Sequence, residues 1–484
     1  MPRCEMDRAE REAAAIAATA ANPRPASEVA GGSGAEARAL AALAWPVVLA
    51  EIGWMGMGLV DTAMVGSISP EAIGAVAVGS HLSFNVAIFG IGILFGLDPI
   101  VSQAVGAGRS GLAHRALLNG LALATLLSFV LVPALWAIAT QLKYFGVDPR
   151  VLPDARVYLE IISWSVPLLL GYTAVRRYLQ GLGLVRPIFW AILFANVFNV
   201  FANWVLIFGH LGLPALGVAG SAWATTSARL LMCAWLGIVA ARHARRDRAG
   251  RAEAPPKLDL SLLAGLLRVG LPAGIHIAVE GGIFTVVTLV AASLDPVSLA
   301  AHQIALSVAA FTFMVPLGLS TAAAVRVGYA VGGRDRARAA AAGRAALSLG
   351  ALFMGSAAIA FLLAPRAILA LFTDDPAVMT LGVSLLAVAA VFQLFDGTQV
   401  VSSGILRGTG ETRLPMLIAL AGFWGLGLPV GLLFCFSLGL GVIGLWIGIT
   451  AGLVSVATAL LVVWHRRVPG LPDGAAPAEP PLRC

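Results

Sequence analysis

Twelve apolar segments of helical length make up most of this chain. A helix needs about 20 apolar residues to cross the hydrocarbon core of a bilayer. The segments are centred near 40–64, 74–97, 115–139, 157–179, 187–208, 217–240, 262–291, 298–324, 341–364, 380–404, 415–436 and 441–464. Hydrophobic residues form 59% of the chain and charged residues 12%, against about 45–50% and about 25% in soluble domains. The sequence therefore predicts an all-α integral membrane protein with twelve transmembrane helices.

Basic residues between the apolar segments predict the orientation of the chain. The formal net charge is +7, but these residues form no single basic face of the kind that a nucleic-acid partner requires. Alternate connections carry most of them, namely Arg109, Arg115, Arg176, Arg177, Arg186, Arg242, Arg245, Arg246, Arg248, Arg251, Lys257, Arg326, Arg334, Arg336, Arg338, Arg407 and Arg413. The intervening connections carry Lys143, Arg150, Arg156 and Arg366. By the positive-inside rule the first set is cytoplasmic, and with twelve spans both termini are cytoplasmic too.

The two halves of the chain repeat each other. The tripeptide AVG occurs at 104–106 and again, 226 residues later, at 330–332, and the same shift places Pro46 on Pro272. Each half holds six helices, so both copies enter the membrane from the same side. This pattern indicates two bundles related by a pseudo-two-fold axis along the membrane normal.

The repeat suggests a division of the chain into bundles, linker and tails. We expect a disordered cytoplasmic tail, a six-helix bundle, a basic cytoplasmic linker, a second six-helix bundle and a second disordered tail at 1–38, 39–241, 242–258, 259–465 and 466–484. A substrate cavity between two halves that can rock is typical of transporters. The sequence has no nucleophile elbow, Walker A loop, HExxH motif or dinucleotide fingerprint, so we expect no enzyme activity and no cofactor.

Several motifs resemble those of the multidrug and toxic compound extrusion family, in particular its NorM-type branch. They are Pro46 followed by VDTAMVG (60–66), LAAHQIAL (299–306), AAVRVGYAVGGRD (323–335) and SGILRGTGETR (403–413). The similarity runs in order from about 40 to 464. It implies a monomeric multidrug efflux antiporter in a bacterial inner membrane, surrounded by lipid, that exports small amphiphilic organic cations in exchange for sodium or protons.

Two acids of the second half are candidates for the cation site. Glu280 and Asp396 lie deep in separate apolar segments, where ionisable groups are rare and face a protein interior or a water-filled cavity. Two carboxylates in one cavity would hold a cation between them or share a proton. The resemblance places both at the family's cation site, and we favour Na⁺ as the tentative metal ion. Phe392, one turn before Asp396, offers a cation–π face or ordinary packing.

A third deep acid, Asp61, belongs to the first half. By resemblance, polar residues surround it, namely Asn199, Asn203 and Thr225. Asp61 is therefore expected to respond to protons or cations in a polar pocket, and Pro46 gives its helix a place to bend. The alternative for all three acids is a packing role beside a buried arginine, chiefly Arg229.

Other residues and functions have weaker support. Asp98 and Glu160 lie near span ends and are interpreted as interfacial, and Glu51 has either a cavity role or a local hydrogen bond. The alternative functions are a flippase for a lipid-linked substrate, for which cavity arginines are expected, and a membrane-embedded enzyme.

The orientation can be tested by labelling. A tag on either terminus, or in the linker near Arg248, should react only from the cytoplasmic side, because the basic connections lie there. Labelling of any of these three positions from outside intact cells would reverse the assignment.

Overall fold

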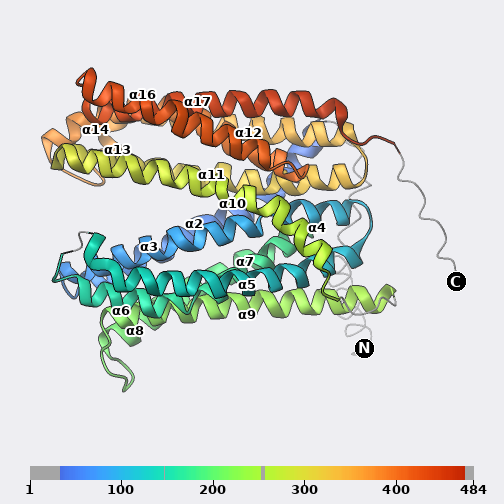
Figure 1. Cartoon of the computed structure of the whole chain (residues 1–484), viewed down its shortest axis with the longest axis horizontal. Coiled ribbons are helices and arrows are strands. Elements are labelled where there is room, and N and C mark those ends of the chain that lie inside the picture. Colours follow the sequence, from blue (N-terminus) through green and yellow to red (C-terminus); the bar gives the residue numbers. More distant parts are fainter. Residues whose placement is uncertain (1–32, 146–147, 252–256, 475–484) are drawn as a thin grey trace, which may run out of the picture.

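The computed structural model of the chain describes residues 33–145, 148–251 and 257–474, and within these ranges it is helical and contains no strand (Figure 1). Its α-helices are α2 (Ser33–Gly66), α3 (Pro70–Leu94), α4 (Leu97–Gly106), α5 (Ser110–Gln141), α6 (Leu152–Ser163), α7 (Val166–Gly181), α8 (Arg186–Phe208), α9 (Val218–Arg251), α10 (Leu260–Leu294), α11 (Pro296–Gly332), α12 (Arg336–Leu363), α13 (Pro365–Leu369), α14 (Pro376–Gly408), α15 (Arg413–Ala419), α16 (Leu428–Leu432) and α17 (Gly441–Arg467). Short 3₁₀ turns are η2 (Leu142–Phe145) and η5 (Val468–Gly470), and π-helical stretches are η3 (Leu420–Gly427) and η4 (Leu433–Ser437).

The lengths of these helices agree with a membrane-spanning fold. Eleven of the described helical segments are long and apolar enough to cross a bilayer, and the bent pair α6 and α7, which meet at 45°, can form a twelfth. Helices α3 and α4 together make one of these segments, and α15 to η4 make another. The predicted all-α membrane fold is confirmed.

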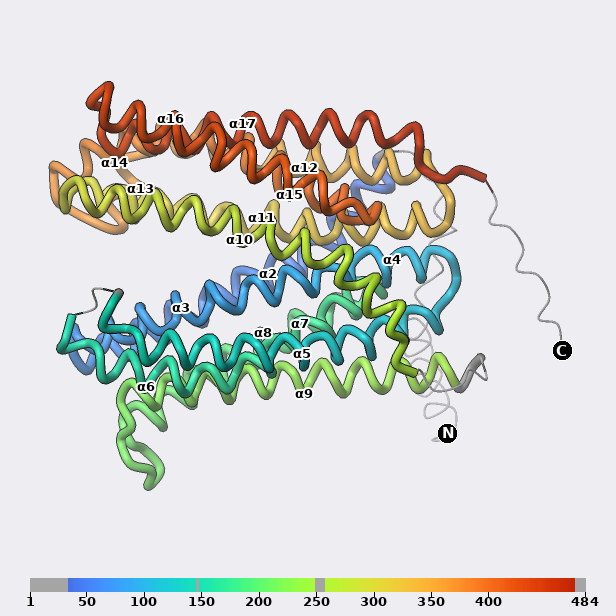
Figure 2. The backbone as a smooth tube through the Cα atoms, in the orientation of Figure 1, coloured from blue at the N-terminus to red at the C-terminus, as the bar shows by residue number. Residues whose placement is uncertain are grey.

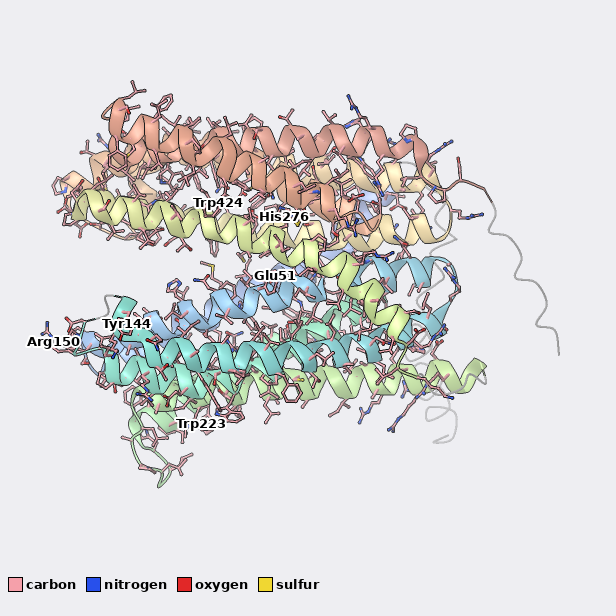
Figure 3. All side chains as sticks on the ribbon, viewed as in Figure 1. Glu51, Tyr144, Arg150, Trp223, His276 and Trp424 are labelled. Atoms are coloured by element: carbon pink, nitrogen blue, oxygen red, sulfur yellow. The ribbon has the colours of Figure 1, made fainter. Side chains whose placement is uncertain are left out.

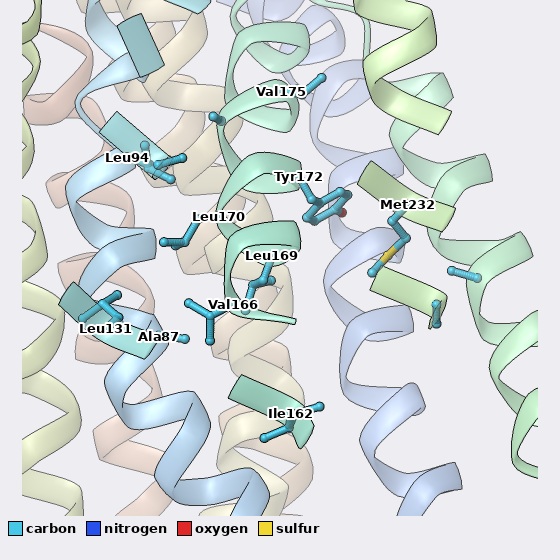
Figure 4. Packing of buried hydrophobic residues seen from close by; sticks show 14 of the residues in the cluster. Ala87, Leu94, Leu131, Ile162, Val166, Leu169, Leu170, Tyr172, Val175 and Met232 are labelled. Carbon is cyan, nitrogen blue, oxygen red and sulfur yellow. The ribbon is translucent and has the colours of Figure 1, made fainter. Parts of the chain in front are cut away.

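The helices form two lobes. Figures 1 and 2 show α3 to α9 in one lobe and α11 to α17 in the other, with α2 and α10 passing between them. The buried apolar residues likewise form two clusters, one for each lobe. Figure 4 shows part of the first, where Leu94, Leu131 and Leu170 pack between neighbouring helices. We call these the N-lobe and the C-lobe.

Helices α2 and α10 each contribute to the core of the opposite lobe. Leu40 and Ala44, near the start of α2, belong to the C-lobe cluster, whereas Leu266, near the start of α10, belongs to the N-lobe cluster. Both helices contain a proline inside, Pro46 and Pro272, which removes one helical hydrogen bond. The two helices therefore cross between the lobes in equivalent ways, as expected for the two copies of the internal repeat.

Glycines bring the two lobes into close contact at the end of the molecule that carries the last turns of α9 and the start of α10, which we call the linker end. A Cβ atom on Gly106 would lie 2.2 Å from the Tyr329 carbonyl oxygen, and one on Gly332 would lie 2.1 Å from the Gln103 carbonyl oxygen. These two contacts are related by the 226-residue shift. Only glycine, which has no Cβ, allows two backbones to approach so closely.

Two hydrogen bonds between the lobes follow the same symmetry. Gln103 Nε2 donates to the Gly408 carbonyl across 2.9 Å, and Tyr329 Oη donates to the Gly181 carbonyl across 3.0 Å. Gly181 and Gly408 occupy matching places in the segments QGLG and RGTG of the two halves. Figure 2 shows the lobes meeting at the linker end and diverging toward the opposite end of the molecule. The linker-end contacts thus form a seal.

Ion pairs tie the start of α2 to the C-lobe. Glu36 is buried and receives hydrogen bonds from Arg326 of α11 (2.5 Å) and Arg338 of α12 (3.0 Å). Residues 33–38 therefore belong to a helix and not to the predicted disordered tail, because Glu36 is tied to the C-lobe.

Of the predicted tails and linker, the structure describes only the residues next to the two bundles. Residues 1–32, 252–256 and 475–484 lie outside the described residues. Within the predicted linker, α9 continues to Arg251. Within the predicted C-terminal tail, α17 continues to Arg467 and η5 follows it.

The seal predicts a sharp difference between two glycine substitutions. Gly332→Ala should lower the thermal unfolding midpoint, since overpacking costs about 1–3 kcal/mol and the new Cβ would overlap a backbone oxygen. Gly265→Ala in α10 meets open space and should stabilise by up to about 1 kcal/mol. Equal midpoints for the two purified variants would contradict the seal.

Candidate functional site

A cavity of about 520 Å³ lies between the two lobes. Helices α2, α3 and α7 line it from the N-lobe, and α11 and α14 line it from the C-lobe together with α10. Most of its lining is apolar or aromatic, including Trp54, Phe84, Tyr172, Phe284 and Phe313. This volume and character suit a drug-sized ligand, whose orientation a few polar groups can fix.

The C-lobe wall of this cavity carries the two predicted cation-site acids. Glu280 of α10 and Asp396 of α14 both line it, and they are close enough for electrostatic repulsion between their carboxylates. Neither has a salt-bridge partner among the described residues. The Gln399 side chain lies beside Glu280 and, at 3.4 Å, beside His276 Nε2. Figure 3 labels His276 on this side of the molecule.

Aromatic residues bracket the acid pair. Phe284 follows Glu280 by one helical turn and Phe392 precedes Asp396 by one turn, and their ring centroids lie 6.1 Å apart, edge to face. Phe392 also contacts Trp446 at 5.7 Å and is 2% exposed. Phe392 thus lines the cavity and also packs α10, α14 and α17 together.

Asp61 lies in a separate pocket inside the N-lobe. Its two carboxylate oxygens accept hydrogen bonds from Asn203 Nδ2 of α8 and Thr225 Oγ1 of α9, each 2.6 Å long. Asn203 also donates to Asn199 Oδ1 across 3.2 Å. The structure therefore brings together the four polar residues that the sequence grouped, and it places Asp61 outside the lining of the central cavity.

The alternative interpretation, a carboxylate paired with the buried Arg229, finds no salt bridge among the described residues, although Arg229 lies near enough to Asp61 for an electrostatic interaction. Arg229, the expected partner of a packing carboxylate, donates to Ser165 Oγ across 2.5 Å and lies over the ring of Trp54. Arg176 pairs with Glu51, and both residues line the cavity. Figure 3 labels Glu51 between the lobes.

Asp98 was wrongly interpreted as interfacial. It is 1% exposed, and one of its oxygens accepts from Arg407 (2.9 Å) and lies 3.5 Å from Arg177. Both guanidinium groups lie over the ring of Phe95, at 3.7 Å for Arg177 and 4.7 Å for Arg407. Because Arg407 comes from the C-lobe, this cluster links the two lobes at the linker end of the cavity. Glu160, by contrast, is half-exposed and pairs with Arg156, as an interfacial residue would.

Three arginines assigned to cytoplasmic loops are therefore part of the protein interior. Arg176 and Arg177 lie in α7 and Arg407 lies in α14, all of them buried. Arg326, also assigned to a loop, lies within α11. The signal was present in the sequence, since 176 and 177 fall inside the apolar segment 157–179 and the turn glycines come only after them. Buried arginines are held by carboxylates, which relieve the cost of desolvation.

Ion pairing within the described residues leaves the two C-lobe acids of the lining, Glu280 and Asp396, without an arginine partner. Glu51 forms a salt bridge with Arg176, and Glu411 forms one with Arg467. Asp98 forms salt bridges with both Arg177 and Arg407. These contacts involve every arginine and glutamate of the lining other than Glu280, and the single Asp98 carboxylate faces two guanidinium groups, which leaves one positive charge in excess there. No cluster of three or more metal-binding side chains occurs in the described parts of the chain. Two carboxylates and the Gln399 amide oxygen nonetheless offer the hard ligands that a small monovalent cation prefers.

Known proteins share this sequence and architecture. The sequence profile of the MatE family matches residues 46–205 and 272–433. A probable multidrug resistance protein NorM of Mesorhizobium japonicum is 38% identical over 442 residues, which cover 89% of this chain and 94% of that protein. A protein of the same description from Burkholderia pseudomallei is 39% identical over 434 residues, covering 88% and 92%.

Solved structures agree in fold. The crystal structure of the eukaryotic MATE transporter AtDTX14 superposes with a TM-score of 0.82 at 20% identity, covering 91% of this chain and 99% of that one. A structure described as the outward-facing conformation of a multidrug resistance MATE family transporter gives a TM-score of 0.79 at 19% identity, covering 91% and 97%. From its sequence relatives, and in agreement with this fold, the chain belongs to the MatE family, and it is a membrane transporter and not an enzyme.

Proposed function

We propose that this protein is a multidrug efflux antiporter that exports amphiphilic organic cations. The observation that carries the proposal is the cavity itself, whose aromatic and apolar lining contains two carboxyl groups, Glu280 and Asp396, with no salt-bridge partner among the described residues. A negative field in a cavity with low-dielectric walls attracts cations, and aromatic faces bind them. Relatives described as multidrug resistance proteins support export as the direction of transport.

The coupling ion is proposed to be sodium, bound between Glu280 and Asp396. A sodium ion would relieve the repulsion between the two carboxylates, and an organic cation would compete for the same field. Mutual exclusion of this kind makes exchange possible, because each ligand favours a different state of the cavity. Protons are the alternative coupling ion, since one member of a crowded carboxylate pair binds a proton readily.

Alternating access is proposed to occur by rocking of the two lobes. The seal closes the linker end, and the basic residues there support a cytoplasmic position for it, in what we propose is a bacterial inner membrane. With both termini cytoplasmic, the structure then corresponds to an outward-open state. Reaching the inward-open state requires that the Asp98–Arg407 pair and the two linker-end hydrogen bonds between the lobes separate. We further propose that one chain is the transport unit, because the cavity is built by its own two lobes.

A lipid-linked substrate remains the second candidate, because one observation favours it. Arg176, Arg177 and Arg407 line the cavity, as a flippase for an anionic headgroup would require. Their pairing with Glu51 and Asp98 reduces the charge available to such a headgroup. An expressing strain whose resistance changes only toward anionic compounds would contradict cation export.

Asp61 supplies a first test of ion-responsive transport. Asp61→Asn should insert and bind drug, yet lose at least about tenfold in drug efflux, because the amide can mimic the neutral carboxyl but not the ionised one. The two donors from Asn203 and Thr225 suit an ionised carboxylate. Ser128→Ala, which affects only a local bond within α5, is the control. Full efflux by a well-expressed Asp61→Asn protein would leave this residue a packing role.

The choice of coupling ion has its own test. In proteoliposomes, efflux of a cationic dye should accelerate when sodium is added outside at constant pH. Glu280→Gln and Asp396→Asn should each abolish this acceleration, because either change removes one of the two charges that hold the ion. Efflux that ignores sodium but responds to an inward proton gradient would replace sodium by protons and retain the antiporter.

A further inference from the structure

Helix α10, which carries Glu280, is contacted on the side away from the cavity by a span that contains π-helical turns. The span from Arg413 to Ser437 contains the π-helical stretches η3 and η4. A π-helical turn holds an extra residue, is rare, and occurs frequently at functional sites. Trp424 lies within η3, and Figure 3 labels it next to α10.

The back of this span is fixed on α17 by glycines. A Cβ on Gly448 would lie 2.2 Å from the Cα of Gly431, and one on Gly452 would lie 2.7 Å from the Gly422 carbonyl oxygen. Two backbones in such contact leave little freedom for sliding or rotation. The packing on α17 therefore fixes the backbone position of Trp424.

The front of the span reaches α10 through the Trp424 ring. Its Nε1 donates to the Val279 carbonyl oxygen across 3.0 Å, and its ring would lie 3.2 Å from a Cβ placed on Gly282. At 3.6 residues per turn, Gly282 is about 200° around the helix from Glu280. The indole thus holds the turn that carries Glu280 from the face opposite the cavity.

This turn needs a fixed position because of the proline before it. Pro272, eight residues before Glu280, leaves one carbonyl of α10 without its helical partner, so the helix can bend there. Bending would carry Glu280 toward or away from Asp396 on α14. Trp424 opposes that movement, since its hydrogen bond and ring contact join α10 to the fixed span.

The geometry points to Trp424 as a positioning residue, which sets the distance between Glu280 and Asp396 and thereby the affinity for the coupling cation. This inference rests on the proposed function, in which these two carboxylates bind that ion. Trp424 lies outside the lining of the cavity, so its effect reaches the ion through α10. Removing its N–H should weaken ion binding without changing the groups that a drug touches.

The principal experiment is Trp424→Phe in proteoliposomes, with efflux of a cationic dye measured against sodium and against proton concentration. Phenylalanine keeps an aromatic ring at position 424 and removes both the donor to Val279 and the outer indole atoms that face Gly282. The half-saturating concentration of the ion that drives wild-type efflux should rise about three- to tenfold, the range for loss of one hydrogen bond. The maximal rate at saturating ion should stay within about twofold of wild type.

Matched variants separate positioning from general damage. Trp190→Phe changes an exposed tryptophan of the N-lobe and should leave the half-saturating concentration unchanged. Gly282→Ala pushes against the same ring and should raise it, whereas Gly265→Ala, in open space on the same helix, should not. In a Glu280→Gln background, Trp424→Phe should leave the dissociation constant of the dye unaltered.

Each contrary outcome has a distinct meaning. An unchanged half-saturating ion concentration in both Trp424→Phe and Gly282→Ala would overturn the positioning role while the antiporter proposal stands. A fall in maximal rate and thermal midpoint with no change in ion dependence would show a merely structural tryptophan. Wild-type efflux that responds to neither ion would overturn the antiporter proposal and this inference with it.

Discussion

The cost of burying charge in a protein surrounded by lipid governs the interior of this transporter. A charge taken out of water is tolerated only where a partner and hydrogen bonds compensate it. Glu36, Glu51 and Asp98 each have arginine partners, whereas Asp61 has two neutral donors instead. Glu280 and Asp396 face each other's field in the cavity with neither kind of relief in full. That exception supports the proposal that the pair binds a cation that arrives and leaves.

The internal repeat survives in backbone contacts and disappears in charges. Gly106 and Gly332 make equivalent contacts with the opposite lobe, and so do Gln103 and Tyr329 through their hydrogen bonds. Arg407, however, corresponds to Gln180 in the repeat, and it alone of the two reaches across to Asp98. Backbone packing tolerates few substitutions where Cβ atoms would overlap, so it preserves symmetry, while side chains in the cavity are free to diverge. Two lobes with one architecture can therefore bind different ligands.

Sequence patterns predicted the features that depend on local composition and failed for those that depend on long-range pairing. Apolar segment lengths predicted the membrane helices, and family motifs grouped Asp61 with Asn203 and Thr225, which the structure brings together. The fate of Asp98 could not be read from its neighbours, because its partner Arg407 lies 309 residues away. The role of Trp424 was invisible for a similar reason, since its contact with Val279 spans 145 residues and a tryptophan in an apolar segment looks like ordinary lining.

The two helices that carry the proposed cation site also carry contacts between the lobes at the linker end, which gives a physical route between the site and the seal. Helix α14 bears Asp396 and, eleven residues later, Arg407, which binds Asp98 of the other lobe. Eleven residues of helix span about 16 Å, and this part of α14 contains no proline, so a tilt imposed at Asp396 reaches Arg407 undiminished. Helix α10 bears Glu280 and the linker-end glycine Gly270, whose Cβ position is 1.9 Å from the Ile93 carbonyl oxygen, but Pro272 interrupts it between the two. A cation that draws Glu280 and Asp396 together would therefore act on the seal rigidly through α14, and through α10 only as far as Trp424 holds that helix straight.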